Sequence, residues 1–325
     1  MITLKKDSKK DFTILNLTDP QLSDSEWEDG HSYRKILEYT VSELIKRTKP
    51  DLITISGDLA WAGHDYAYKQ LALLLEQFQI PWAPVWGNHD NQGGAEYIDK
   101  IATDYLSYPH CVYEKGDAEM GNGNYVVCIE EDGKIVEALF MMDSHDRDDC
   151  VDGNGNIQKV YLKLTEKQMQ WYREQTKFLK AKGCKDSTMI LHIPIYAFCV
   201  ASRAAYKTSV SLKDLALAQA EGTECWKEGY IDSVGVQHEA IGSHPENDGV
   251  FAIIKEEGLT KTIVAGHDHV NNWMIRYEGV TMVYALKTGA GCYWEPCMNG
   301  GTVLKVNNNG VYDILHEYVD VSHLL

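Results

Sequence analysis

Apolar residues in the first third of the chain follow two alternating spacings. Short runs rich in β-branched residues at 12–18, 51–56 and 84–86 predict buried strands, each followed by a turn-forming sequence. Between them, residues 33–46 and 66–78 carry apolar side chains three and four positions apart, which predicts amphipathic helices. This alternation of strands and helices predicts a sheet covered by helices.

The rest of the chain continues with both kinds of element. Helices are predicted at 165–182, where the sequence has a capping-box pattern, and at 247–257. Short alternating apolar runs predict strands at 124–129, 135–142, 188–191, 261–265, 273–277, 280–284, 302–306 and 311–316. The polar stretch 143–156 lacks such periodicity, as does 201–249 apart from one short helix near 212–220, so both are predicted to be loops.

We expect a single domain over residues 1–325, because no linker, repeat or low-complexity tract divides the sequence. The region 201–249 is then a long loop or lid, a kind of segment that is usually functional or mobile. No apolar run reaches the roughly 18 residues of a membrane span. The N-terminal lysines precede no apolar segment of a signal peptide. With eight irregularly spaced cysteines, these features predict a cytoplasmic protein with mostly reduced thiols.

The chain is strongly acidic, with 31 Lys and Arg residues against 48 Asp and Glu residues and a formal net charge of -17. A surface of this charge repels phosphate backbones and anionic lipids, so the composition argues against a nucleic-acid or membrane partner. If the substrate is an anion, the attracting charge must be local, and a bound metal ion is one source.

Five polar clusters directly follow predicted strands. They are Asp19-Pro20-Gln21, Gly57-Asp58, Gly87-Asn88-His89-Asp90, His192 and Gly266-His267-Asp268-His269. Because sites in open α/β sheets form beyond the carboxyl ends of strands, we expect these side chains to meet at one rim. They offer nitrogen and oxygen donors without cysteine, which suits Mn, Fe or Zn.

Seven candidate donors are too many for one four-coordinate ion and fit a pair of ions that share a carboxylate and a bridging water. Taken alone, each cluster has a structural interpretation: Asp19-Pro20 is an ordinary turn, Gly57-Asp58 a strand end and His192 a core histidine. The order and strand-end placement of all five together favour the metal site.

Together these clusters resemble the motifs of the calcineurin-like metallophosphoesterases, D-x-[HQ], G-D-x-x, G-N-H-[DE], a lone His and G-H-x-H. Ser56-Gly57-Asp58, Gly266 to Asn271 and Thr288-Gly289-Ala290-Gly291 are similar to the branch around the Dcr2-like and small purple-acid-phosphatase-like phosphatases. The resemblance implies an α/β fold of four α/β/β/α layers, in which two mixed sheets are flanked by helices.

The resemblance also implies a role for each residue. Asp58 would bridge two ions, with Asp19, Gln21 and His269 completing one site and Asn88, His192 and His267 completing the other. A bridging hydroxide would attack the phosphorus atom of the substrate. His89 would lie beside the phosphoryl group as a catalytic residue, and Asp90 would hold the His89 imidazole in position.

The expected function is hydrolysis of a small phosphomonoester. A phosphodiesterase or nucleotide pyrophosphatase would use the same dimetal core, and a non-catalytic scaffold would keep only the fold. Retention of His89 argues against the scaffold, since this residue serves only the chemistry. Gln21 stands where most of the family has His, which favours Mn or Fe over Zn. The tyrosine of true purple acid phosphatases is absent, because Trp61 and Ala62 follow the Gly57-Asp58-Leu59-Ala60 motif.

Three further pairs of residues are weaker candidates. His145 and Asp146 would reach the rim from the loop after residue 142, and Tyr293 and Trp294 would line the substrate pocket. His238 and His244 would belong to the predicted lid region. The oligomeric state has no signature in the sequence.

Overall fold

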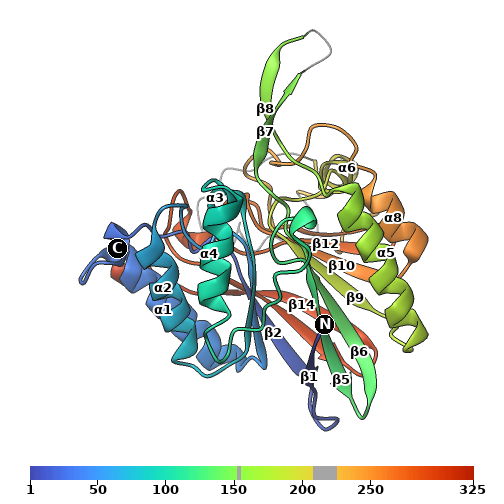
Figure 1. Cartoon of the computed structure of the whole chain (residues 1–325), viewed down its shortest axis with the longest axis horizontal. Coiled ribbons are helices and arrows are strands. Elements are labelled where there is room, and N and C mark those ends of the chain that lie inside the picture. Colours follow the sequence, from blue (N-terminus) through green and yellow to red (C-terminus); the bar gives the residue numbers. More distant parts are fainter. Residues whose placement is uncertain (152–154, 208–224) are drawn as a thin grey trace.

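Two mixed β-sheets pack face to face between two layers of helices (Figure 1). A computed structural model of the chain describes residues 1–151, 155–207 and 225–325. In these ranges the larger sheet has seven strands, in the order β1 (Ile2–Lys5), β5 (Tyr125–Glu131), β6 (Lys134–Met141), β9 (Ser187–Leu191), β10 (Thr260–Ala265), β12 (Val280–Tyr284) and β11 (Met274–Tyr277).

The smaller sheet contains both parallel and antiparallel neighbours, as the larger one does. Its five described strands run in the order β14 (Gly310–Tyr318), β13 (Gly300–Asn307), β2 (Phe12–Leu17), β3 (Leu52–Ser56) and β4 (Trp82–Val85). Strands β2, β3 and β4 are parallel to one another, so their carboxyl ends lie at the same edge of the sheet.

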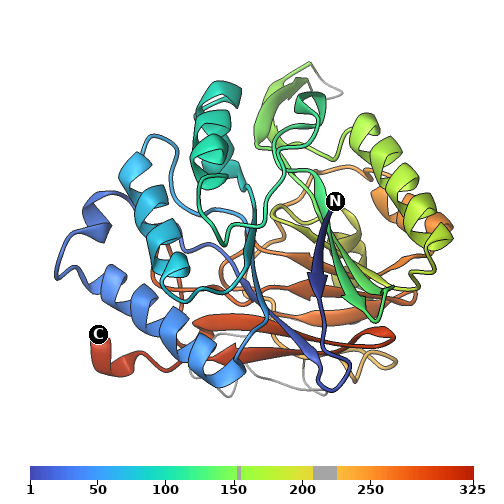
Figure 2. The same cartoon turned by 60° about the horizontal axis from the view of Figure 1, so that its bottom comes forward.

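Each sheet is covered on its outer face by its own helices (Figure 2). The smaller sheet is covered by α1 (Ser32–Thr48), α2 (Asp65–Glu76) and α4 (Ala95–Tyr105). The larger sheet is covered by α5 (Glu166–Ala181), α6 (Ala197–Ala205) and α8 (Val250–Glu257). The four-layer α/β/β/α architecture expected from the resemblance is therefore confirmed.

The alternation of side chains along a strand explains why apolar residues run continuously through the sheets. On β6, Leu139 and Met141 point into the core between the sheets, whereas Ala138 and Phe140 point toward the helices. A strand that is buried on both faces cannot show the polar–apolar alternation of a surface strand.

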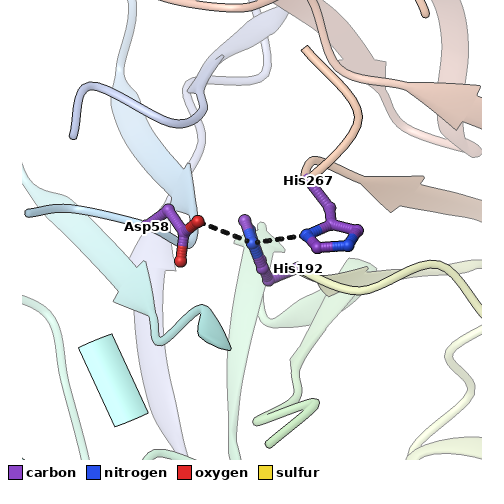
Figure 3. A group of neighbouring side chains, drawn as sticks. All are labelled: Asp58, His192 and His267. Carbon is purple, nitrogen blue, oxygen red and sulfur yellow. Dashed lines mark hydrogen bonds and ion pairs between the residues drawn. The ribbon is translucent and has the colours of Figure 1, made fainter. Parts of the chain in front are cut away.

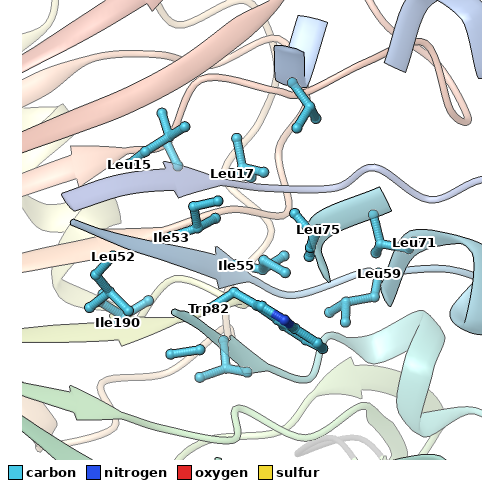
Figure 4. Close-up of a cluster of buried hydrophobic side chains, with 14 of the residues drawn as sticks. Leu15, Leu17, Leu52, Ile53, Ile55, Leu59, Leu71, Leu75, Trp82 and Ile190 are labelled. Atoms are coloured by element: carbon cyan, nitrogen blue, oxygen red, sulfur yellow. The ribbon is translucent and has the colours of Figure 1, made fainter. Parts of the chain in front are cut away.

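Buried aliphatic and aromatic side chains fix β2 and β3 between their neighbours (Figure 4). Leu15, Ile53, Ile55 and Trp82 are fully buried, and Ile190 from the larger sheet belongs to the same cluster. Burying one such side chain contributes roughly 1.5–3 kcal/mol. The core thus gives a rigid support to the strand ends at which the polar clusters lie.

The structure corrects the prediction for residues 143–156. Part of that stretch forms β7 (Arg147–Val151), which pairs with β8 (Ile157–Tyr161) in an antiparallel ribbon outside the two large sheets. Its side chains are mostly exposed, so the sequence carries no alternation that would mark the strands.

The predicted loop or lid 201–249 is only partly described. Its first residues end helix α6, and residues 225–249 contain no helix and only isolated bridges among described residues. The helix predicted near 212–220 lies outside the described residues. None of the described helices has the length and apolar character that would let it cross a bilayer.

Candidate metal centre

Strand ends of both sheets bring the five polar clusters to one edge of the molecule. Asp19, Asp58 and Asn88 follow β2, β3 and β4 of the smaller sheet, and His192 and His267 follow β9 and β10 of the larger one. Backbone hydrogen bonds tie these loops together: the amide of Asp19 donates to the Gly57 carbonyl (3.1 Å) and that of Gln21 to the Asp58 carbonyl (3.2 Å).

The backbone is unusual at four of the predicted ligands. Asp19, Gln21, Asp58 and His267 have φ angles of 54°, 45°, 48° and 79°. Only a few per cent of residues other than glycine adopt the left-handed region, and such strain concentrates at functional sites. The conformation of these residues indicates that the fold holds their side chains in one place at a cost in stability.

Close approach of the loops requires glycine beside two ligands. A Cβ atom on Gly87 would lie 2.1 Å from Oδ1 of Asp58, and one on Gly57 would lie 2.4 Å from Nδ1 of His192. Both contacts are far shorter than any side chain tolerates. These two glycines therefore make room for the predicted ligands.

Asp58, His192 and His267 form the centre of the cluster (Figure 3). One potential ligand atom from each lies within 4.8 Å of the others. Nε2 of His192 is 3.2 Å from Oδ2 of Asp58 and 3.3 Å from Nδ1 of His267. All three side chains are buried, so bulk water has little access to their donor atoms.

Asp19, Gln21 and His269 extend the cluster on one side. Nε2 of His269 is 3.2 Å from Oδ1 of Asp19, and the Gln21 amide nitrogen is 3.3 Å from Oδ2 of Asp58. Asn88 is also buried, and the amide of His89, the next residue, donates to Oδ1 of Asp58 (2.9 Å).

Two buried oxygens in this group have no hydrogen-bond partner among the described residues: Oε1 of Gln21 and Oδ1 of Asn88. An unpartnered buried oxygen costs roughly 1–3 kcal/mol. Each belongs to a residue predicted to ligate a metal, and a cation would satisfy both. The donor set of carboxylate, amide and imidazole groups therefore fits a pair of metal ions.

The charges of the cluster depend on one another. Burial opposes the charged form of His192, but Asp58 and Asp19 outweigh it and raise the pKa of His192 to about 10. For His267, burial and the neighbouring His192 together lower the pKa to about 3. Without metal, an imidazolium thus balances the buried carboxylates, a role that bound cations would take over.

Hydrogen bonds of Nδ1 in His192 and His269 determine which ring nitrogen faces the cluster. Nδ1 of His192 lies 2.8 Å from the Ser56 carbonyl, and Nδ1 of His269 lies 2.7 Å from the Tyr293 carbonyl. Because a carbonyl only accepts, each Nδ1 carries a proton, so Nε2 is the nitrogen that faces the carboxylates and would bind a metal ion once it has lost its own proton. The Tyr293 ring also stacks on His269, with centroids 4.2 Å apart.

His89 lies at the edge of the cluster, with its imidazole partly open to solvent. Its Nε2 is 4.0 Å from Oδ2 of Asp58, and the side chain is 27% exposed. The Trp61 ring packs against the imidazole at 4.3 Å, and Nδ1 lies 3.1 Å from Oε1 of Gln92.

The structure corrects the prediction that Asp90 holds the His89 imidazole. The Asp90 carboxylate accepts hydrogen bonds from the amides of Leu59, Ala60 and Gly87 and from the Tyr68 hydroxyl. Asp90 is the third residue of the short helix α3 (Asn88–Asn91), and its carboxylate caps the helix start. Gln92, rather than Asp90, holds the His89 imidazole.

The weaker candidates from the sequence differ in how close they lie to the cluster. His145 turns its Nε2 to Oε1 of Gln168 (2.7 Å), whereas the pKa of Asp146, raised by burial, also responds to His89 and Asp58. Tyr293 supports His269 from behind, and Trp294 packs against the hydrophobic core.

The two histidines of the predicted lid region make different kinds of contact. The His238 amide donates to Oδ1 of Asn271 (2.9 Å), and Nδ1 of His244 lies beside the backbone of Glu246. His238 thus contacts the loop that follows β10, and His244 contacts its own segment.

Sequence analysis missed two groups beside the cluster. The Tyr161 ring meets the His267 imidazole edge to face, with centroids 4.5 Å apart. The Lys287 ammonium is buried and donates to the Asp19 carbonyl (2.7 Å). Burial lowers the pKa of Lys287 to about 8, although Asp19 and Asp58 oppose the shift. Neither residue lies in a motif, so only the fold places them here.

The chain is similar in sequence to known phosphoesterases. The sequence model described as calcineurin-like phosphoesterase matches residues 12–271. The phosphatase DCR2 of Saccharomyces cerevisiae is 28% identical over 334 residues, which cover 96% of this chain and 53% of that protein. A protein of Arabidopsis thaliana named "Probable inactive purple acid phosphatase 14" is 26% identical over 275 residues, which cover 76% of this chain and 60% of the relative.

The chain thus spans between half and two thirds of the length of these curated relatives. Among solved structures, a dimetal phosphatase from Danio rerio superposes with a TM-score of 0.60 at 13% identity, covering 94% of this chain and 98% of that one. This likeness shows a shared fold. With the family match over most of its length, the chain belongs to the calcineurin-like phosphoesterase family.

Proposed function

We propose that this protein hydrolyses a small phosphomonoester with the help of two metal ions, with Mn or Fe favoured over Zn. The observation that supports this most is the pair of unpartnered buried oxygens on Gln21 and Asn88, beside the carboxylates and imidazoles of the cluster. A purely structural polar core would satisfy such atoms with protein donors.

Asp58 is the residue best placed to serve both ions. One of its oxygens faces His192, and the Asp58 side chain also approaches Gln21 and the amide of His89. Two bound ions would supply an ionised water at neutral pH and neutralise the oxygens of the phosphoryl group. The carboxamide of Gln21 is a harder donor than imidazole, which is why we favour Mn or Fe.

His89 would act on the leaving group. Its Nε2 faces the cluster from the exposed side, while Trp61 and Gln92 hold the ring. From this position Nε2 would donate a proton or a hydrogen bond to the oxygen of the departing alcohol. The products would be the alcohol and inorganic phosphate.

A non-catalytic role is the second candidate, because several relatives carry the word "inactive" in their names. A phosphodiesterase or nucleotide pyrophosphatase is a third, since it would use the same ligands. His89 favours the enzymatic proposal over the non-catalytic role, because its imidazole faces the cluster and is partly exposed.

The test is an assay of purified protein with p-nitrophenyl phosphate and bis-p-nitrophenyl phosphate after loading with Mn, Fe or Zn. We expect turnover of the monoester to exceed that of the diester and to disappear in the Asp58→Ala variant. A preference for the diester would favour the phosphodiesterase. No turnover with either ester by metal-loaded protein would refute the enzymatic proposal.

A further inference from the structure

The base of the β7–β8 ribbon lies at the candidate metal centre. The ribbon projects from the body of the molecule (Figure 1), and Arg147 at its first position pairs directly with Tyr161 at its last. These two residues are therefore at the end where the ribbon joins the body, away from its tip.

A ring contact places this end beside a candidate metal ligand. The Tyr161 ring packs edge to face on the imidazole of His267, with centroids 4.5 Å apart. On the other strand, the residue before Arg147 is Asp146, whose carbonyl accepts from the Leu162 amide (2.9 Å). Burial raises the pKa of Asp146, and the charge of His89 opposes this shift.

The guanidinium of Arg147 is held by the aromatic ring rather than by a carboxylate. Its Cζ atom lies 4.1 Å from the centre of the Tyr161 ring, and Nη2 donates to the Tyr161 hydroxyl. The side chain is exposed and forms no salt bridge with the described residues. Stacking limits the freedom of the guanidinium while its N–H groups stay available to an anion.

A cation in this place matters because the protein has a net charge of -17. A second positive side chain beside the cluster, Lys287, is buried and donates to a backbone carbonyl. Arg147 is thus a cation that is both near the cluster and open to solvent.

We propose that Arg147 binds a phosphoryl oxygen of the substrate and thereby gives the site a preference for monoesters over diesters. The inference rests on the proposed function. A monoester has three non-bridging oxygens and up to two negative charges, whereas a diester has two such oxygens and one charge. If two bound metal ions took up two of these oxygens, only the monoester would present a third to a guanidinium, whose paired N–H groups fit a phosphate. Tyr161 acts as a positioning residue.

The experiment compares kcat/KM for p-nitrophenyl phosphate and bis-p-nitrophenyl phosphate in the Mn-loaded wild type and in the Arg147→Ala, Arg147→Lys and Tyr161→Leu variants. Arg147→Ala should lower the monoester value by roughly 10–100-fold, the loss expected for one charged hydrogen bond, and change the diester value by less than about threefold. Arg147→Lys should recover part of the loss, and Tyr161→Leu should raise KM more than it lowers kcat.

Lys159→Ala is the matched control, because Lys159 is an exposed cation on the same ribbon, farther from its base. It should leave both esters unchanged. An equal loss for both esters in Arg147→Ala, or no loss for either, would overturn the assignment of Arg147 while leaving the proposed function intact.

If the wild type hydrolyses neither ester, the proposed function fails and phosphate binding still tests Arg147. Calorimetric titration of Mn-loaded protein with inorganic phosphate should then show at least tenfold weaker binding for Arg147→Ala. Equal affinity of the two proteins, or no binding by the wild type, would overturn the inference.

Discussion

Replacing Asp90 tests which of two roles it has: holding the candidate metal-binding loops together, or orienting the His89 imidazole. The carboxylate of Asp90 accepts from the amides of Leu59 and Ala60 after β3, from the amide of Gly87 after β4 and from the hydroxyl of Tyr68 on α2. It therefore joins two loops that carry predicted ligands to a helix that covers the sheet.

The magnitude follows from these contacts. Asp90→Ala leaves three buried amides and a buried hydroxyl without their acceptor, and each costs roughly 1–3 kcal/mol when unpaired. Part of this loss is offset, because burial and the nearby Asp58 raise the pKa of Asp90 to about 7 and the change removes that charge. We expect a net loss of about 2–4 kcal/mol in the free energy of unfolding. That is a large share of the 5–15 kcal/mol typical of folded proteins.

Urea denaturation gives the free energy of unfolding, and elemental analysis gives the metal content of the same samples. Asp90→Ala should lose stability and metal together, and Asp90→Asn, which keeps one acceptor oxygen, should lose less of both. The exposed Asp104→Ala on α4 is the control and should change stability by less than about 0.5 kcal/mol. A variant of Asp90 with normal stability and metal content but a lower kcat would show that it acts on His89, and our reasoning would be wrong.

Two further substitutions test the chemistry and the electrostatics. The His89→Ala variant should keep its metal, and its kcat for alkyl phosphates should fall by about 10²-fold or more. The fall should be smaller for p-nitrophenyl phosphate, because its leaving group needs no proton. Equal losses of kcat for the two esters in steady-state assays would contradict a proton-donating role. The second substitution, at Glu137, tests the pH dependence of stability. Burial and the neighbouring Asp186 raise the pKa of Glu137 well above its ordinary value, and burial raises the pKa of Asp186 to about 7. Because both folded-state pKa values exceed the unfolded ones, the folded protein binds more protons, so the stability is fully present below about pH 4 and decreases as the pH rises through about 7. Glu137→Gln should flatten this decrease in thermal unfolding series from pH 4 to 8 and be the more stable protein at pH 8, and an unchanged slope would show that the pair does not titrate as described.

The sequence was sufficient to predict that the candidate ligands lie together, because the clusters that carry them follow strands. Asp19, Asp58 and His267 come directly after short apolar runs, and the rule that strand ends share an edge places them together without knowledge of the packing. The same runs indicated the helices and sheets, since apolar spacing reports which face of an element is buried.

The sequence was not sufficient for residues whose role depends on packing between distant segments. Asp90 stands in a motif, but its partners are amides of another loop and a tyrosine of α2, which only the fold brings near. Arg147 and Tyr161 lie on an exposed ribbon without a core, so neither hydrophobic spacing nor a motif marks them. In the structure Asp90 is the third residue of α3, and its carboxylate bonds to the amide of Gly87 at the helix start.

The central claim is that seven side chains from both sheets form one dinuclear metal site. Its most direct test is equilibrium dialysis of metal-free protein against Mn, with the bound metal counted by elemental analysis. We predict two ions per chain for the wild type and a loss of both in Asp58→Ala, because Asp58 lies at the centre of the cluster. A wild type that binds no Mn at saturating concentration, or an Asp58→Ala variant that still binds two ions, would contradict the account.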